Sequence, residues 1–281
     1  MAKLLDGKQV AAALNEKIKT DVSELQERGV LPTLAIVRVG EKGDLVAYER
    51  GATKRCEMLG AGVRSIILPE DVPQKQLLDT LSLINEDDLI HGCLMLRPLP
   101  AHIDDCAVRN ALCSEKDVDG ITDGSIAGVF TGTCGGFPPC TAKACIEILD
   151  HFGVELKGKR VAVIGRSIIV GKPVSMMLMS RHATVTICHT RTVDMPEICR
   201  NSEILIVAAG SAGIVDKNFF SPGQVVIDVG INVDENGKLR GDVDFAAAEQ
   251  VVEAITPVPG GVGSVTTSVL VSHVVETAKS M

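Results

Sequence analysis

A glycine-containing segment at residues 165–173 (GRSIIVGKP) has the residue types of an anion-binding turn. It follows a continuous apolar run and precedes a helical pattern that begins near Pro173. A turn between a buried strand and a helix points backbone N–H groups at an anion, usually a phosphate. Because Ser167 stands where the dinucleotide fingerprint has its second glycine, a tight connection without a ligand is the alternative.

The segment after the next apolar run (residues 188–192, CHTRT) indicates which dinucleotide would bind. Folds that bind NAD normally place an acidic residue here, which contacts the ribose 2′-hydroxyl. This sequence has Thr190 and Arg191 instead, and Arg166 supplies a second cation nearby. The pattern favours a 2′-phosphate, and therefore NADP over NAD. A solvated surface charge is the alternative for Arg191, and His189 receives no catalytic role.

The composition excludes several classes of partner. The 281 residues are 46% hydrophobic but include only six Phe, one Tyr and no Trp, which argues against base-stacking surfaces. The net charge of −8 has the wrong sign for a nucleic-acid binder. The longest charge-free apolar stretch, around residues 204–215, is too short to cross a bilayer. The nine cysteines form no Cys-x-x-Cys pair, so we expect reduced thiols, no metal centre and a cytoplasmic protein without a membrane partner.

Two series of alternating strands and helices must position these segments. The first series begins with a helical pattern at residues 10–28 and continues with strands at 33–40, 63–68 and 90–96 and helices at 44–59 and 74–85. A glycine-rich connection at residues 117–141, expected to be irregular, follows it. The second series begins with a helix at 141–151, has strands at 160–165, 183–187, 204–210 and 225–230, and ends in a helix at 264–279. This alternation predicts an α/β fold of two domains with parallel sheets.

Three runs in this order carry a resemblance to a known family. They are KDVDG at residues 116–120, the glycine turn at 165–173, and TPVPGGVG at 256–263. The sequence resembles methylenetetrahydrofolate dehydrogenase/cyclohydrolase essentially from end to end. The resemblance implies a homodimer with a parallel-sheet folate domain, residues 1–140 completed by the C-terminal helix at 264–281. It also implies a Rossmann-like NADP-binding domain at residues 141–263.

The resemblance implies an activity in one-carbon metabolism. The family oxidises 5,10-methylenetetrahydrofolate to the methenyl form by hydride transfer to NADP, and then hydrolyses that product to 10-formyltetrahydrofolate. By position, the residues lining NADP would be Gly165, Arg166, Ser167, Thr190, Arg191 and Ile231. Those lining the folate would be Tyr48, Asp119, Pro257, Gly260, Gly261, Val262 and Gly263. Tyr48, the single tyrosine, is expected to stack on the folate, and a buried core tyrosine is the alternative.

The sequence departs from the family where hydrolysis needs an acid–base group. Ala52 stands in place of a lysine four residues after Tyr48, and Leu96 stands in place of a glutamine. On a helix, Lys54 lies about 120° from Tyr48, whereas a residue four positions on lies within about 40°. On a strand, Arg97 would face away from the side of Leu96. We therefore expect an intact dehydrogenase with hydrolysis lost or strongly reduced.

The alternative is that Lys54 or Arg97 restores hydrolysis through an altered local geometry. The catalytic candidates are Tyr48 and Asp119, with Lys54 added because of this alternative. Two other functions stay open at this point. One is another Rossmann-type NAD(P) dehydrogenase with a separate substrate domain, because fold alone does not fix function. The other is a folate- or NADP-binding protein without activity.

Overall fold

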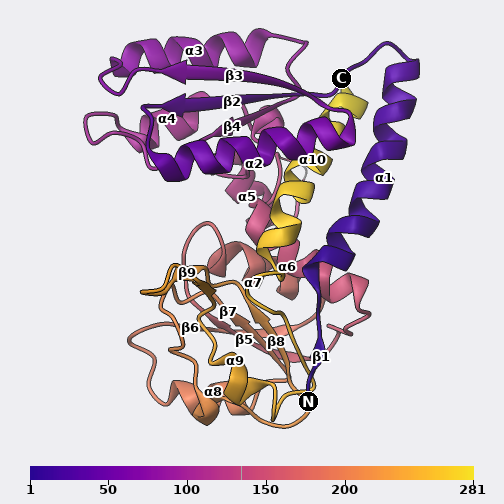
Figure 1. Cartoon of the computed structure of the whole chain (residues 1–281), viewed down its shortest axis with the longest axis vertical. Helices are drawn as coiled ribbons and strands as arrows, with labels where there is room; N and C mark the ends of the chain where they lie inside the picture. Colours follow the sequence, from indigo (N-terminus) through magenta and orange to yellow (C-terminus); the bar gives the residue numbers. More distant parts are fainter. Residues whose placement is uncertain (134) are drawn as a thin grey trace. The chain divides into compact units, whose positions relative to one another are not determined.

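The computed structural model describes residues 1–133 and 135–281, so Cys134 lies outside the described residues. The chain divides into two compact units (Figure 1). Met1–Ala12 and Thr141–Thr266 form the six-stranded unit, and Ala13–Cys140 and Thr267–Met281 form the three-stranded unit. The eight cysteines among the described residues are free thiols.

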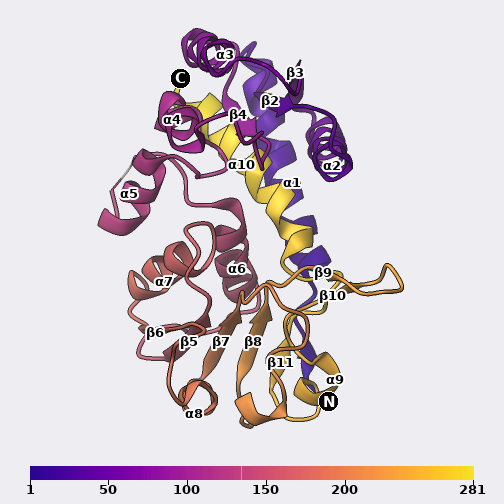
Figure 2. The same cartoon turned by 90° about the vertical axis from the view of Figure 1, so that its left-hand side faces the viewer.

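The three-stranded unit contains a parallel sheet with the order β3-β2-β4. Its strands are β2 (Thr33–Val39), β3 (Gly62–Leu68) and β4 (Gly92–Met95). Every residue of the central strand β2 is buried, as expected for an apolar strand covered on both faces. Figures 1 and 2 show α2 (Gly43–Leu59) and α3 (Gln74–Glu86) on opposite faces of this sheet, because the two crossovers run toward opposite edges. The predicted alternation of strands and helices is confirmed here.

The connection that we expected to be irregular contains a helix, α5 (Asp123–Thr131). The Thr122 hydroxyl caps its first turn by accepting a hydrogen bond from the Ser125 N–H at 3.1 Å. Gly132 ends it in the left-handed conformation with φ of 71°. Glycines inside this helix weaken the apolar periodicity, so the prediction of irregular structure was wrong for these residues. Two shorter helical segments of the unit are α4 (Asp105–Ala111) and the 3₁₀ turn η1 (Ser114–Lys116).

The six-stranded unit has a parallel sheet with the order β1-β11-β8-β7-β5-β6. The four predicted strands are present as β5 (Arg160–Ile164), β6 (Thr184–Cys188), β7 (Ile204–Val207) and β8 (Val225–Asp228). The other segments are α7 (Gly171–Met179), α8 (Met195–Arg200), η2 (Lys217–Phe219), α9 (Phe245–Ala248) and a hairpin of β9 (Asn232–Val233) and β10 (Leu239–Arg240). Figure 2 shows β5, β6, β7, β8 and β11 side by side.

The edge of this sheet differs from the prediction. Lys3 and Leu4 form β1, which pairs in parallel with β11 (Ala254–Ile255), although the sequence placed the first residues with the folate domain. Two-residue strands have no period that a sequence can display, which is why both were missed.

Three longer helices include residues at the division between the units: α1 (Gly7–Glu27), α6 (Cys140–His151) and α10 (Gly263–Ser280). No helix in the described part of the chain combines the length and the apolar character needed to cross a membrane.

Candidate active site

The glycine turn lies at the carboxyl end of β5, between its two neighbours β6 and β7. Gly165 has φ of +120°, and a Cβ atom added there would meet the Ala208 carbonyl oxygen at 2.2 Å. A Cβ added at Gly171, the first residue of α7, would meet the Gly165 carbonyl oxygen at 2.1 Å. Both positions therefore require glycine, because three backbone segments converge at this point.

Ser167 shapes the turn where the usual fingerprint has a second glycine. Its hydroxyl accepts a hydrogen bond from the Val170 N–H at 3.1 Å, and its carbonyl accepts one from the Lys172 N–H at 3.0 Å. The side chains of Arg166 and Ser167 are exposed. The turn thus presents a cation, a hydroxyl and the N-terminus of the nine-residue helix α7, which suits an anionic group.

The segment after β6 provides the second cation. The His189 N–H donates to the Thr192 hydroxyl at 2.9 Å, and the Arg191 N–H donates to His189 Nδ1 at 3.1 Å. These bonds fix a tight loop from which the Thr190 and Arg191 side chains extend into solvent. Since β5 and β6 pair in parallel, Arg166 and Arg191 follow the same edge of the sheet. His189 has a structural role in this loop.

Asp242 organises the loop that follows β7. Its carboxylate accepts hydrogen bonds from the N–H groups of Ala209, Gly210 and Ser211 at 2.6, 2.7 and 2.9 Å. It also accepts one from the Asn232 side-chain amide at 2.9 Å. Sequence reasoning did not single out Asp242 as a functional residue; its place in a GDV run was the available signal.

Asp228 ends β8 and holds the segment that carries Asp242. Its carboxylate accepts hydrogen bonds from the N–H groups of Gly230, Asp242 and Val243 at 3.0, 3.0 and 3.1 Å. Burial raises the pKa of Asp228 to about 6, while these backbone bonds oppose the shift. The folded chain therefore binds this proton more tightly than the unfolded chain does.

This pKa shift predicts a pH dependence of stability that an Asp228→Asn variant lacks. A carboxyl whose pKa is raised on folding stabilises the protein below its ordinary pKa, and the contribution is lost as the pH rises through about 6. Between about pH 4 and pH 7, the wild type should lose up to about 3 kcal/mol of unfolding free energy relative to the variant. Denaturant unfolding of both proteins at the two pH values measures this. If the difference in unfolding free energy between wild type and Asp228→Asn is the same at both pH values, this prediction is contradicted.

The predicted loop at residues 257–263 lies against Ile231 in a cavity of about 270 Å³. The structure thus brings together six predicted site residues from both proposed ligand sets: Ile231, Pro257, Gly260, Gly261, Val262 and Gly263. Gly260 has φ of +108°, a conformation that favours glycine. The loop is close to the chain start as well, because a Cβ at Gly7 would meet the Gly261 carbonyl oxygen at 2.1 Å.

In the three-stranded unit, Tyr48 of α2 lies near Asp119, as the resemblance implies. Tyr48 is 39% exposed, so the alternative of a buried core tyrosine was wrong. Partial burial of the phenol, the Asp119 carboxylate and the Cys140 thiol all raise the pKa of Tyr48. Burial, helped by the nearby charge of Asp117, also raises the pKa of Asp119 to about 7.

Cys140, the first residue of α6, is a member of this cluster that sequence reasoning missed. Its thiol donates to the Val118 carbonyl at 3.2 Å and lies 3.8 Å from His273 Nδ1. The neighbouring thiol lowers the pKa of Asp119, and burial raises the pKa of Cys140. The FPPC run at residues 137–140 was the available signal, because an irregular proline-rich segment in an enzyme is often functional.

The two positions where the resemblance would place a lysine and a glutamine are apolar and buried. Ala52 is 0% exposed and Leu96 is 4% exposed. Lys54 is exposed, and within the described residues no hydrogen bond or ion pair joins it to Tyr48 or Asp119. The structure does not bring Lys54 to the predicted site.

Arg97 lies outside the strand on which its sequence-based prediction relied. We expected strand alternation to turn it away, but β4 ends at Met95. The alternation rule therefore does not apply to this residue, and its positive charge acts on Asp119, lowering the pKa of that carboxyl.

Comparison with known proteins identifies the family. The family sequence model for the tetrahydrofolate dehydrogenase/cyclohydrolase catalytic domain matches residues 5–119. The family sequence model for the NAD(P)-binding domain of the same enzymes matches residues 139–281. The bifunctional protein FolD of Clostridioides difficile is 48% identical over 276 residues, which cover 98% of this chain and 96% of that protein.

Two solved structures are also similar over nearly the whole chain. The bifunctional FolD of Campylobacter jejuni has a TM-score of 0.97 at 36% identity, covering 100% of this chain and 99% of that one. The FolD of Trypanosoma brucei, complexed with NADP cofactor and inhibitor, has a TM-score of 0.93 at 36% identity, with coverages of 99% and 98%. The chain belongs to the tetrahydrofolate dehydrogenase/cyclohydrolase family.

Proposed function

We propose that this protein oxidises 5,10-methylenetetrahydrofolate to 5,10-methenyltetrahydrofolate with NADP as the hydride acceptor. The observation that carries the proposal is the intact cofactor turn of a family member, with glycine required at positions 165 and 171. The Tyr48–Asp119 pair supports the substrate assignment. NADPH formation on mixing the purified protein, methylenetetrahydrofolate and NADP tests it, and no NADPH or NADH formation with either nicotinamide cofactor would overturn it.

The proposed site residues form one set for NADP and another for the folate. The NADP-binding residues would be Gly165, Arg166, Ser167, Thr190, Arg191 and Ile231, all in the six-stranded unit. The folate-binding residues would be Tyr48 and Asp119, in the three-stranded unit, and the loop at residues 257–263, in the six-stranded unit. NADP supplies the hydride acceptor when bound, so the chain's own task is to position the folate and to favour the charge that develops on it.

Asp119 is suited to that electrostatic task. Loss of a hydride from the methylene bridge leaves a positive charge shared by the two flanking nitrogen atoms of the folate. A carboxylate held nearby stabilises this charge as it forms. Tyr48, with its ring partly exposed, would stack on the folate and orient it.

The exposed cations predict the choice of cofactor. Replacing Arg191 by alanine should raise KM for NADP by about 10- to 100-fold, because a charge-assisted hydrogen bond contributes about 1.5–3 kcal/mol. KM for NAD, which lacks the 2′-phosphate, should stay within about twofold of wild type. Steady-state kinetics with both cofactors measure this.

Arg160→Ala is the matched control for that measurement. Arg160 is also exposed and charged, but it lies at the amino end of β5, where it pairs with Glu203 at 3.3 Å. This variant should leave both KM values unchanged. Equal increases of KM for NADP and NAD in Arg191→Ala would contradict a contact with the 2′-phosphate.

We further propose that hydrolysis of the methenyl product is lost or strongly reduced in this protein. The support is the apolar burial of Ala52 and Leu96 and the lack, among the described residues, of a hydrogen bond or ion pair between Lys54 and the Tyr48–Asp119 pair. Hydrolysis requires proton transfers, so it needs a tuned acid–base group that hydride transfer does not need.

A cytoplasmic homodimer completes the proposal, on the basis of family membership. Light scattering of the purified protein tests the oligomeric state, and a monomer at micromolar concentration would overturn it. A protein that binds folate and NADP but forms no NADPH is the competing function, and the same oxidation assay distinguishes the two.

A further inference from the structure

His273 of α10 is a buried histidine that binds the backbone next to Asp119. It is 3% exposed, and its Nδ1 lies 2.8 Å from the Val118 carbonyl oxygen. Because a carbonyl oxygen accepts hydrogen bonds and cannot donate them, Nδ1 carries the proton of this bond. The carbonyl belongs to the planar peptide group that joins Val118 to Asp119. The imidazole therefore fixes the plane from which the Asp119 residue extends.

Two neighbours hold the imidazole and the same carbonyl in place. The Cys140 thiol donates to the Val118 carbonyl at 3.2 Å, so both lone pairs of that oxygen are used. The Phe137 ring stacks on His273, with ring centroids 4.4 Å apart and an angle of 19° between the planes. A stacked ring in a buried site restricts rotation of the imidazole. The Nδ1–H group is therefore aimed at the carbonyl before any ligand binds.

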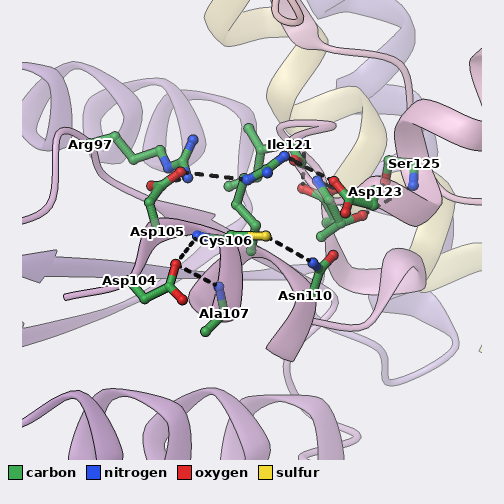
Figure 3. A network of polar contacts seen from close by, with 12 residues as sticks. Arg97, Asp104, Asp105, Cys106, Ala107, Asn110, Ile121, Asp123 and Ser125 are labelled. Atoms are coloured by element: carbon green, nitrogen blue, oxygen red, sulfur yellow. Dashed lines mark hydrogen bonds and ion pairs between the residues drawn. The ribbon is translucent and has the colours of Figure 1, made fainter.

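The chain on the other side of Asp119 is held as well. The Asp117 carboxylate accepts hydrogen bonds from two later backbone N–H groups at 3.1 and 2.7 Å. The Arg109 guanidinium donates to the Ile121 carbonyl at 3.4 Å and to Asp123 at 3.0 Å. Figure 3 shows Ile121 and Asp123 in this polar network at the start of α5. Asp119 therefore lies in a segment whose backbone is fixed on both sides.

We propose that His273 is a positioning residue for the oxidation, which aims the Asp119 carboxylate at the folate through its hydrogen bond to the Val118 carbonyl. The inference rests on the proposed dehydrogenase function. In that reaction the bridge carbon gives a hydride, with both electrons, to the nicotinamide, and the folate becomes a cation. Stabilisation of this cation depends on where the carboxylate lies, and a displacement of about 1 Å can cost about 100-fold in rate.

The kinetics of His273→Leu and His273→Asn test this role. Leucine keeps a buried apolar side chain but has no donor, so kcat for oxidation of methylenetetrahydrofolate should fall by about 10- to 100-fold. KM for NADP should stay within about twofold of wild type, because the proposed NADP residues belong to the other unit. Asparagine places an amide N–H close to the position of Nδ1, so His273→Asn should recover kcat to within about threefold of wild type.

His273→Gln and Val271→Ala are the matched controls. Glutamine carries the same amide one methylene further from the backbone, near the position of Nε2, so it should not restore the rate. Val271 is also fully buried in α10, but it lies about 160° around the helix from His273. Val271→Ala should therefore lower the thermal unfolding midpoint without lowering kcat.

A double-mutant cycle shows whether His273 acts through Asp119. In an Asp119→Asn background, where the carboxylate is missing, His273→Leu should cause no further loss. Single-turnover NADPH formation at high protein concentration measures the low rates of these variants. An unchanged kcat in His273→Leu, equal rates for His273→Asn and His273→Gln, or an additional loss in the Asp119→Asn background would overturn the proposal. Thermal unfolding and NADP titration confirm that each variant is folded, and the asparagine and glutamine variants provide the test if the leucine variant is not.

The wild-type assay distinguishes the two levels of failure. If wild type forms no NADPH from methylenetetrahydrofolate, the proposed function is wrong and the inference falls with it. If wild type is active and His273→Leu has the wild-type kcat, only the role of His273 is wrong.

Discussion

Introducing Ala52→Lys together with Leu96→Gln should increase the hydrolysis of 5,10-methenyltetrahydrofolate by about 10²- to 10⁴-fold, the usual contribution of a positioned acid–base group. Residue 52 follows Tyr48 by one turn of α2, so a lysine there lies on the same helix face as the tyrosine. Burial at this position would lower the pKa of the new amine toward neutrality, where it exchanges protons effectively. The decay of methenyl absorbance with purified protein measures the gain.

The matched control for this gain is Ala52→Met with Leu96→Met. It adds side chains of similar length without an amine or an amide, so it reproduces the packing change alone. This control should show no gain, and both double variants should be somewhat less stable than wild type, because residue 52 is fully buried. Efficient hydrolysis by the wild type, well above the uncatalysed rate, would contradict the assignment of these positions.

Replacing Gly165 by alanine should weaken NADP binding by at least about 100-fold. The added Cβ would lie 2.2 Å from the Ala208 carbonyl oxygen, and φ of +120° is a conformation that alanine rarely adopts. The backbone between β5 and α7 must therefore move, and the N–H groups of the turn would lose their orientation toward the phosphates. Calorimetric titration with NADP measures the loss.

Gly158→Ala controls for the cost of the left-handed conformation alone. Gly158 has φ of +77°, but no atom lies within 4 Å of an added Cβ. This variant should lose about 1–2 kcal/mol of stability and keep its NADP affinity. If Gly165→Ala retains NADP affinity within about twofold, the close approach at the turn is not required for binding.

The local pattern of the sequence was sufficient to predict the two series of strands. β2, β5, β7 and β8 are apolar runs because these parallel strands are covered on both faces, and this burial leaves a direct record in the sequence. The edge strand β6 is partly exposed and is not such a run. The glycine turn was predictable for a similar reason, since backbone crowding at Gly165 and Gly171 admits no side chain. Helix α5 was not predictable in this way because its glycines interrupt the apolar pattern. Strands β1 and β11 were not predictable because each has only two residues, too few to show a pattern.

Tertiary structure decided which side chains surround Asp119. The resemblance implies that Ala52 and Leu96 replace polar residues, but only the folded chain shows that Asp117, Cys140 and Arg97 act on the pKa of the Asp119 carboxyl. Strand alternation cannot predict the direction of Arg97, because the strand ends at Met95. Periodicity describes a residue relative to its own helix or strand, whereas the charge state of Asp119 depends on groups from separate elements and on their distance from water. The sequence alone therefore determined which residue types are present, and the fold determined which of them act electrostatically on the Asp119 carboxyl.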